Sequence, residues 1–200
     1  QKNEDLRFEA LRWIADAQLD SFKREVATML SDAKIEFPIY EACLATWNTL
    51  SGNASLGTVD PQMLIARVSD SQALPRTRAF ALRLIDSNHK RFNPTLWKQL
   101  YDTGDPLLVS ELTRALASVG SSEAISLLLQ IAGDERVGIE TRADAIAGIA
   151  ATNEHSRETL VEFSRSNQQL LRDEALRSLR FAKLTDRQRN TIEQVADQFP

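Results

Sequence analysis

The stretch Arg172-Asp173-Glu174-Ala175-Leu176-Arg177-Ser178-Leu179 decides the fold, because the chain repeats its pattern along its length. An arginine, an alanine three residues later and then an aliphatic residue recur at residues 78–82, 142–146 and 7–11. Looser copies lie at residues 39–43 and 109–113, and the steps between the central residues of neighbouring copies run from 30 to 39 residues. This spacing is typical of stacked repeats, in which each unit buries its apolar face only against its neighbours.

The repeated pattern describes one face of a helix. The alanine, the aliphatic residue that follows it and a second aliphatic residue three positions further on form a single apolar stripe. The small alanine permits a close approach of a neighbouring helix. The arginine lies at the edge of this stripe, where its aliphatic stem can cover the core while its guanidinium group stays in water or pairs with an acidic side chain. We therefore interpret these arginines as structural. Asp70 and Asp134, eight residues before Arg78 and Arg142, are candidate acid partners.

The periodicity predicts two helices per repeat. The expected helices cover residues 3–17, 21–32, 38–50, 61–69, 75–87, 94–102, 106–118, 122–132, 139–151, 155–165, 168–181 and 186–198. The repeated pattern falls on the first, third and every second helix after that. The chain is then expected to open with the second helix of one pair and close with the first helix of another, as a fragment of a longer array does.

Several helix ends are predicted from their own chemistry. Asp60, Asn93 and Asp105 each precede a proline and are expected N-caps. Thr185 with Gln188 predicts a capping box. Four glycines are expected as left-handed C-caps: Gly52, Gly104, Gly120 and Gly133. Gly148 lies inside an apolar helix and predicts a close contact between helices. The irregular connection over residues 50–59 accounts for the longest repeat step.

The period of roughly thirty residues, a turn that begins with Asp and the Arg-x-acid-Ala-Leu pattern resemble the HEAT repeat. The likeness is greatest to the short bacterial kind also found in phycobilisome-lyase proteins, and it is clearest over residues 70–180. It implies an all-α, right-handed α–α superhelix of about six helical hairpins, with residues 1–200 as a single repeat domain. The motif brings no catalytic residue. Ile39 and Val109 replace the arginine in two copies, and Leu112 replaces the alanine in one.

A finer resemblance concerns the run from Arg172 to Arg180 followed by Leu184-Thr185-Asp186. It is similar to HEAT segments of large secreted bacterial proteins, where such arrays separate a propeller-type dehydrogenase-like domain from a c-type cytochrome domain. The chain has no Cys-x-x-Cys-His sequence, so this stretch itself carries no haem. The resemblance implies an exported or periplasmic location rather than a cytoplasmic one, and a spacer role between redox domains.

Composition excludes several classes of protein. Hydrophobic residues make up 42% of the chain, with only 7 Gly and 6 Pro, which excludes a disordered or fibrous protein. No apolar run is long enough to cross a bilayer, so we predict no membrane insertion. The net charge of −4 argues against nonspecific binding to nucleic acid or anionic lipid.

Catalytic and metal-binding motifs were not found. His89 and His155 stand 66 residues apart without metal-ligand spacing, and Glu154-His155 reverses the His-Glu pair used by di-iron HEAT hydroxylases. The glycines of residues 52–57 do not have the spacing of a nucleophile elbow. Cys43 lies on the apolar face of its helix, where a buried inert thiol is expected. The sequence therefore predicts no catalytic, cofactor-binding or metal-binding residue, and no cofactor.

One stretch is strongly basic. Residues 76–98 contain six basic residues and one acidic residue, Asp86. This stretch therefore has a net charge of +5, and the rest of the chain has −9. The candidate partner-binding residues are Arg76, Arg83, Lys90, Arg91, Trp97, Lys98 and Tyr101. They would form a dock for an acidic partner or for a nucleic-acid backbone, with the rings supplying contact area. In the alternative interpretation, Trp97 and Tyr101 fill the core and the basic groups are only solvated.

Trp13 and Trp47 lie on the helices that line the inner wall of HEAT arrays. If exposed, they are anchors for a ligand, but burial is the favoured prediction.

The predicted function is a noncatalytic scaffold or spacer that holds another protein or a neighbouring domain of the same chain. One alternative is an enzyme of the HEAT-like DNA glycosylase type, which needs a basic groove that the acidic net charge disfavours. The other alternative is a lyase-type module acting on a tetrapyrrole, which only the resemblance suggests.

Overall fold

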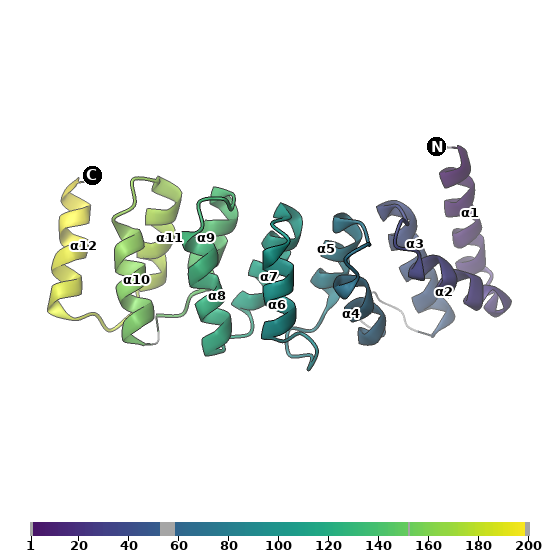
Figure 1. Cartoon of the computed structure of the whole chain (residues 1–200), viewed down its shortest axis with the longest axis horizontal. Coiled ribbons are helices and arrows are strands. Elements are labelled where there is room, and N and C mark those ends of the chain that lie inside the picture. Colours follow the sequence, from purple (N-terminus) through teal and green to yellow (C-terminus); the bar gives the residue numbers. More distant parts are fainter. Residues whose placement is uncertain (1, 53–58, 152, 199–200) are drawn as a thin grey trace. The chain divides into compact units, whose positions relative to one another are not determined.

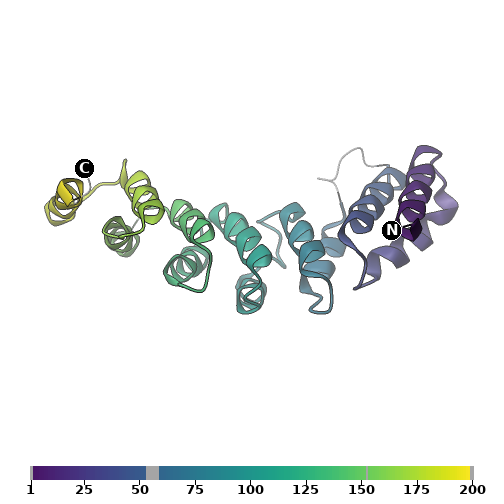
Figure 2. The ribbon, with the colours of Figure 1, turned by 90° about the horizontal axis from the view of Figure 1, so that it is seen from above.

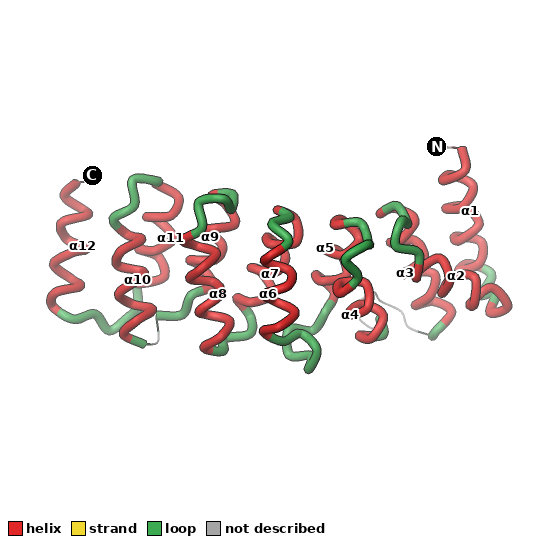
Figure 3. The backbone as a smooth tube through the Cα atoms, viewed as in Figure 1, coloured by secondary structure: helices red, strands yellow, loops and turns green. Residues whose placement is uncertain are grey.

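The computed structural model describes residues 2–52, 59–151 and 153–198, and within them every regular element is a helix (Figures 1 and 3). The α-helices are α1 (Lys2–Asp16), α2 (Lys23–Ser31), α3 (Phe37–Leu50), α4 (Pro61–Ser69), α5 (Pro75–Leu84), α6 (Pro94–Asp102), α7 (Pro106–Ala117), α8 (Ser122–Gly133), α9 (Ile139–Gly148), α10 (Glu154–Ser164), α11 (Gln169–Leu179) and α12 (Asp186–Gln198). The predicted all-α fold is confirmed. The predicted connection at residues 50–59 lies largely outside the described residues.

The main differences from the predicted bounds are at the ends of α5 and α9. Both were expected to run three residues further than they do. Ile85 and Ile149 follow them in extended conformation, with ψ of 133° and 112°. Both side chains are buried. Branching at Cβ favours this extended geometry, which turns the side chain into the core.

The chain divides into two compact units, Gln1–Leu96 and Trp97–Pro200, with the boundary inside α6. In the first unit α1 packs on α3 and α3 on α5, while α2 and α4 pair with α3 and α5. In the second unit α7 packs on α9 and α9 on α11, α8 and α10 pair with α9 and α11, and α12 packs on α10. Figure 2 shows α7, α9 and α11 in one row, with α8 and α10 in another. Each unit is thus a stack of helical hairpins.

The apolar stripe of the repeated pattern forms the core. Ala81, Ala145 and Ala175 are completely buried. Leu82 and Ile146, which follow the first two alanines, are also buried, at 1% and 0% exposure. Leu176 is only half-buried, although its place in the pattern is the same. The difference follows from the neighbours, because α9 lies between α7 and α11, whereas α11 packs on α9 alone among the odd-numbered helices.

Arg78 and Arg142 of the pattern are structural, and each binds a backbone carbonyl group. Arg78 Nε donates to the Val68 carbonyl at 3.0 Å, and Arg142 Nε donates to the Ala132 carbonyl at 2.9 Å. Both carbonyls lie in the last turn of the preceding helix, where no intrahelical donor is available. The expected pairing of Arg142 with Asp134 is wrong, because the Asp134 carboxylate forms its ion pair with Arg136.

The predicted N-caps are confirmed. Asp60 accepts a hydrogen bond from the Gln62 amide at 2.8 Å, and Asp105 accepts from the Leu107 and Leu108 amides at 3.0 and 3.1 Å. Further caps with the expected partners are Asn93 to the Leu96 amide and the reciprocal bonds of Thr185 and Gln188.

Three of the four predicted glycine C-caps are confirmed. Gly52, Gly104 and Gly120 have φ of 75°, 64° and 68°. Gly133 does not adopt positive φ. It is instead the last residue of α8, and Asp134 follows as the C-cap.

Gly148 makes the close helix contact that the sequence predicted. A Cβ atom at Gly148 would lie 2.8 Å from Ala117 Cβ at the end of α7 and 3.2 Å from Leu128 Cδ1 of α8. The first distance is shorter than any van der Waals contact between carbons, which is about 3.5 Å at its closest favourable value. The packing of α9 on α7 therefore requires the absence of a side chain here.

We expect Gly148→Ala to lower the free energy of unfolding by about 1–2 kcal/mol, because the cost of overpacking exceeds the gain in helix propensity. Urea denaturation followed by circular dichroism measures the change. Gly133→Ala is the matched control, since this glycine also ends a helix but has no atom within 4 Å of a built Cβ. Equal stability of the two variants would contradict the close contact.

Candidate functional site

The predicted basic surface is divided between the two units. Arg76, Arg83, Lys90 and Arg91 are exposed in the first unit, and Lys98 is exposed in the second. The Arg76 guanidinium lies over the Phe37 ring, 4.3 Å from its centroid. Lys98 pairs with Asp102 one turn further along α6, at 2.9 Å.

The aromatic members of that predicted surface lie in the core. Trp97 is 4% exposed and Tyr101 is 7% exposed. Their rings therefore do not supply the exposed contact area that a dock for an acidic partner requires. The alternative interpretation, in which both rings fill the interior, is correct for these two residues.

Tyr101 belongs to a polar cluster that joins neighbouring hairpins of the second unit. Its hydroxyl donates to Asp134 Oδ2 at 2.6 Å, across 33 residues of sequence. Arg136 binds the same carboxylate through its side chain, with Nη2 at 2.7 Å from Oδ2 and Nε at 2.9 Å from Oδ1. The Arg136 amide also donates to Oδ1, at 3.0 Å. With a longer contact from Nε to Oδ2 at 3.2 Å, the carboxylate accepts five hydrogen bonds from these two residues.

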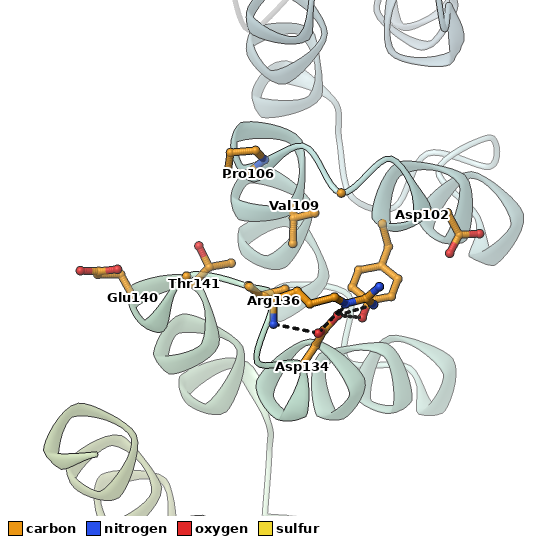
Figure 4. Close-up of a pocket in the computed structure, with 11 residues that line it drawn as sticks. Asp102, Pro106, Val109, Asp134, Arg136, Glu140 and Thr141 are labelled. Carbon is orange, nitrogen blue, oxygen red and sulfur yellow. Dashed lines mark hydrogen bonds and ion pairs between the residues drawn. The ribbon is translucent and has the colours of Figure 1, made fainter. Parts of the chain in front are cut away.

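This cluster forms one wall of a cavity of about 530 Å³ in the second unit. The other walls come from the end of α6, the first turn of α7, the loop after α8 and the first turn of α9. In Figure 4 the Arg136 side chain extends across the pocket to Asp134, and Pro106 and Val109 lie on the α7 side. Glu140 points away from the Arg136–Asp134 pair.

The cluster holds its charges firmly. The Arg136 side chain and the Tyr101 hydroxyl hold the pKa of the Asp134 carboxyl well below its usual range, since both stabilise the ionised form. Burial and the bond to Asp134 raise the pKa of Tyr101. Asp134 in turn raises the pKa of Arg136. At neutral pH the cluster therefore contains a neutral tyrosine, a carboxylate and a guanidinium.

This arrangement can bind a polar group but offers no reactive one. The lone pairs of Asp134 are occupied, and the Tyr101 hydroxyl already donates its one hydrogen bond to Asp134. Arg136 differs, because the carboxylate takes only the edge formed by Nε and Nη2, and the side chain remains 85% exposed. Its Nη1 edge is therefore directed away from Asp134 and is held in a fixed orientation.

In the first unit the prediction for Trp13 is wrong. Trp13 is 72% exposed, because it lies on the side of α1 away from the buried Leu11. Trp47 is half-buried, and the Lys23 ammonium lies 5.1 Å from its ring centroid. Cys43 is completely buried, and burial raises the pKa of its thiol to about 12. The expected buried thiol is confirmed.

Among the described residues, no group of three or more His, Cys, Asp or Glu side chains is placed to hold a metal ion. His89 and His155 both lie near the surface, His89 half-buried and His155 exposed. None of the described helices is both long enough and apolar enough to cross a membrane. Comparison with protein families, curated proteins and solved structures found no match for this chain.

Sequence reasoning did not predict Arg136 as part of a site, and it assigned Asp134 the wrong partner. The available signal was the Asp-x-Arg turn after α8, which departs from the Asp-x-Gln turn at Asp70 after α4. This turn alone does not predict the cluster, because the cluster also needs Tyr101, which belongs to a different hairpin.

We expect Asp134→Asn to lower the melting temperature at pH 7, because the amide keeps the shape but loses the charge that Arg136 and Tyr101 bind. The folded-state pKa of Asp134 is depressed, so its stabilisation is present above the unfolded value of about 3.9 and is lost as the pH falls through the folded value. The difference between wild type and variant should be constant above about pH 5 and shrink on acidification below about pH 4. Calorimetry across this range measures it.

Asp102→Asn is the control for this measurement, because Asp102 is exposed and pairs with the exposed Lys98. Exposed pairs contribute about 0–1 kcal/mol, so the control should stay close to wild type. A pH-independent difference for Asp134→Asn would show that the carboxylate charge is not what stabilises the turn.

Proposed function

We propose that this chain is a noncatalytic scaffold of HEAT-like repeats that holds another protein or a neighbouring domain. The observation that carries the proposal is the orientation of Arg136 at the pocket of the second unit. Asp134 fixes one edge of the guanidinium, while the other edge stays open to a ligand. A pre-oriented donor of this kind loses little conformational entropy when it binds.

The pocket has the chemistry to bind a short peptide segment. Nη1 of Arg136 can donate to a main-chain carbonyl or to a carboxylate of the partner. Pro106 and Val137 offer apolar surface to a neighbouring side chain of the same segment. A volume of about 530 Å³ lies within the range of pockets that bind small ligands and is suited to a few residues of peptide.

A binding role fits the polar groups of the pocket better than a catalytic one. A general base needs a lone pair that accepts a proton near the operating pH, whereas Asp134 has a depressed pKa and is already engaged by Tyr101 and Arg136. A cysteine nucleophile needs an accessible thiolate, whereas Cys43 is buried with a raised pKa. Both facts support a scaffold.

Selection of short random peptides displayed on phage against the wild-type chain tests this proposal. We expect enriched peptides to bind Arg136→Gln about ten-fold more weakly, since a hydrogen bond to a charged group contributes about 1.5–3 kcal/mol. Fluorescence anisotropy with the synthetic peptides measures the dissociation constants. Arg165→Gln is the matched control, because Arg165 is an exposed arginine of the same unit that pairs loosely with Glu162 at 3.8 Å.

Two results would count against the proposal. One is the absence of any enriched peptide over selection without the protein. The other is a set of peptides that bind wild type and Arg136→Gln with equal affinity.

A further inference from the structure

Helix α1 has two apolar faces, and only one of them is covered. Leu11 on the inner face is 2% exposed, and Thr46 of α3 donates a hydrogen bond to the Leu11 carbonyl at 3.2 Å. On the other side Leu6, Ala10 and Trp13 follow one another at helical spacing and form what we call the outer face of α1. Leu6 is 70% exposed and Trp13 is 72% exposed.

The internal repeat shows what the position of Trp13 does elsewhere in the chain. The residue three positions after the central residue of each repeat is, in chain order, Trp13, Ala45, Leu84, Ala115, Gly148 and Ser178. In α9 and α11 this residue touches the preceding odd-numbered helix. Gly148 of α9 lies against Ala117 of α7, and Ser178 of α11 donates to the Ile146 carbonyl of α9 at 3.3 Å. The outer face of α1 therefore corresponds to a helix-packing face.

The size of Trp13 defines what can pack there. At Gly148 a single added Cβ would lie 2.8 Å from Ala117, so a contact as close as that of α7 with α9 has no room for an indole. A helix opposite Trp13 must offer a small residue or a recess to receive the ring. Exposed tryptophans that enter such recesses are among the side chains that contribute most to protein binding.

The border of the outer face carries negative charge. Asp5, Glu9 and Asp16 are exposed and share the side of α1 next to Trp13. Arg12 lies within ion-pair distance of both Glu9 and Asp16, at 3.9 and 3.6 Å, and offsets part of this charge. Residues 3–16 contain four acidic and two basic side chains, so the segment carries −2. A partner with basic residues along its border is complementary to it.

We infer that the outer face of α1 binds an amphipathic helix of a partner protein. The apolar stripe of that helix carries a small residue opposite Trp13 and is bordered by lysine or arginine. The inference rests on the proposed scaffold role but concerns a second surface, in the first unit, that does not involve Arg136. Apolar burial of Leu6 and Trp13 supplies affinity, and the acidic border selects the orientation of the helix.

The test uses a fluorescein-labelled peptide of about 15 residues, long enough to form a helix when bound. Its alanine and leucine residues form one stripe, and lysines line one border. We expect wild type to bind it, and Trp13→Ala to bind about ten-fold or more weakly. Phe181→Ala is the matched control, because Phe181 is a 90% exposed aromatic residue of the second unit. This variant should bind the peptide with the affinity of wild type. Glu9→Gln combined with Asp16→Asn should reduce the salt dependence of binding.

A peptide of the same composition in scrambled order separates helix recognition from simple charge attraction. Equal binding of the scrambled peptide, or unchanged binding by Trp13→Ala, would overturn the inference. So would concentration-dependent dimerisation of the wild type in sedimentation that Trp13→Ala abolishes, because a second copy would then be the occupant. Arg136→Gln should bind the helical peptide like wild type, so failure here is distinguishable from failure of the pocket.

Discussion

Carbonyl groups in the last turn of a helix lack donors within the helix, and every hairpin of a helical repeat contains such an end close to the core. In this chain arginine side chains reach back to these groups. Arg78 and Arg142 each bind such a carbonyl ten residues earlier, and Arg172 binds the carbonyl of Ser166, two residues after the end of α10, at 3.0 Å. Arg67 serves the same need between hairpins, donating to the carbonyls of Leu30 and Asp32 while its guanidinium lies 4.9 Å from the Tyr40 ring centroid. These bonds tie the end of one helix or its following turn to a later helix, which helps to hold the apolar stripes together.

The turns themselves repeat, and the pocket is a variation on one of them. After each of five even-numbered helices a short polar side chain accepts a hydrogen bond from the amide two residues further on, which is the geometry of an Asx or Ser/Thr turn. These residues are Asp32, Asp70, Thr103, Asp134 and Ser166. At Asp134 the same carboxylate also binds Tyr101 and the Arg136 side chain. A structural turn thereby becomes a place where a charged donor is held in one orientation at the rim of a cavity.

The sequence predicted the helices, their caps and the arginines as structural, because each depends on residues close together in the chain. Its errors concern choices that depend on distant neighbours. An apolar stripe does not disclose which of two helix faces will be covered, so Trp13 was expected inside, although α3 covers only the opposite face of α1. For Trp97 and Tyr101 the same uncertainty left two interpretations open. The role of Arg136 was not readable, because it depends on a tyrosine from another hairpin.

The two candidate surfaces differ in physical kind, and this difference matters for a scaffold. At the pocket Asp134 offsets the charge of Arg136, so the attraction of this pair for a charged partner is small and discrimination depends on the geometry of one guanidinium edge. At the outer face of α1 the main contribution is exposed apolar area, which favours affinity and tolerates variation in the partner. In stacked repeats stability comes from each unit and its nearest neighbours, so a turn or an exposed helix face can change without disturbing hairpins further along. Side chains such as Arg136 and Trp13, which depart from the residues at equivalent repeat positions, are therefore where binding specificity can arise at little cost to the fold.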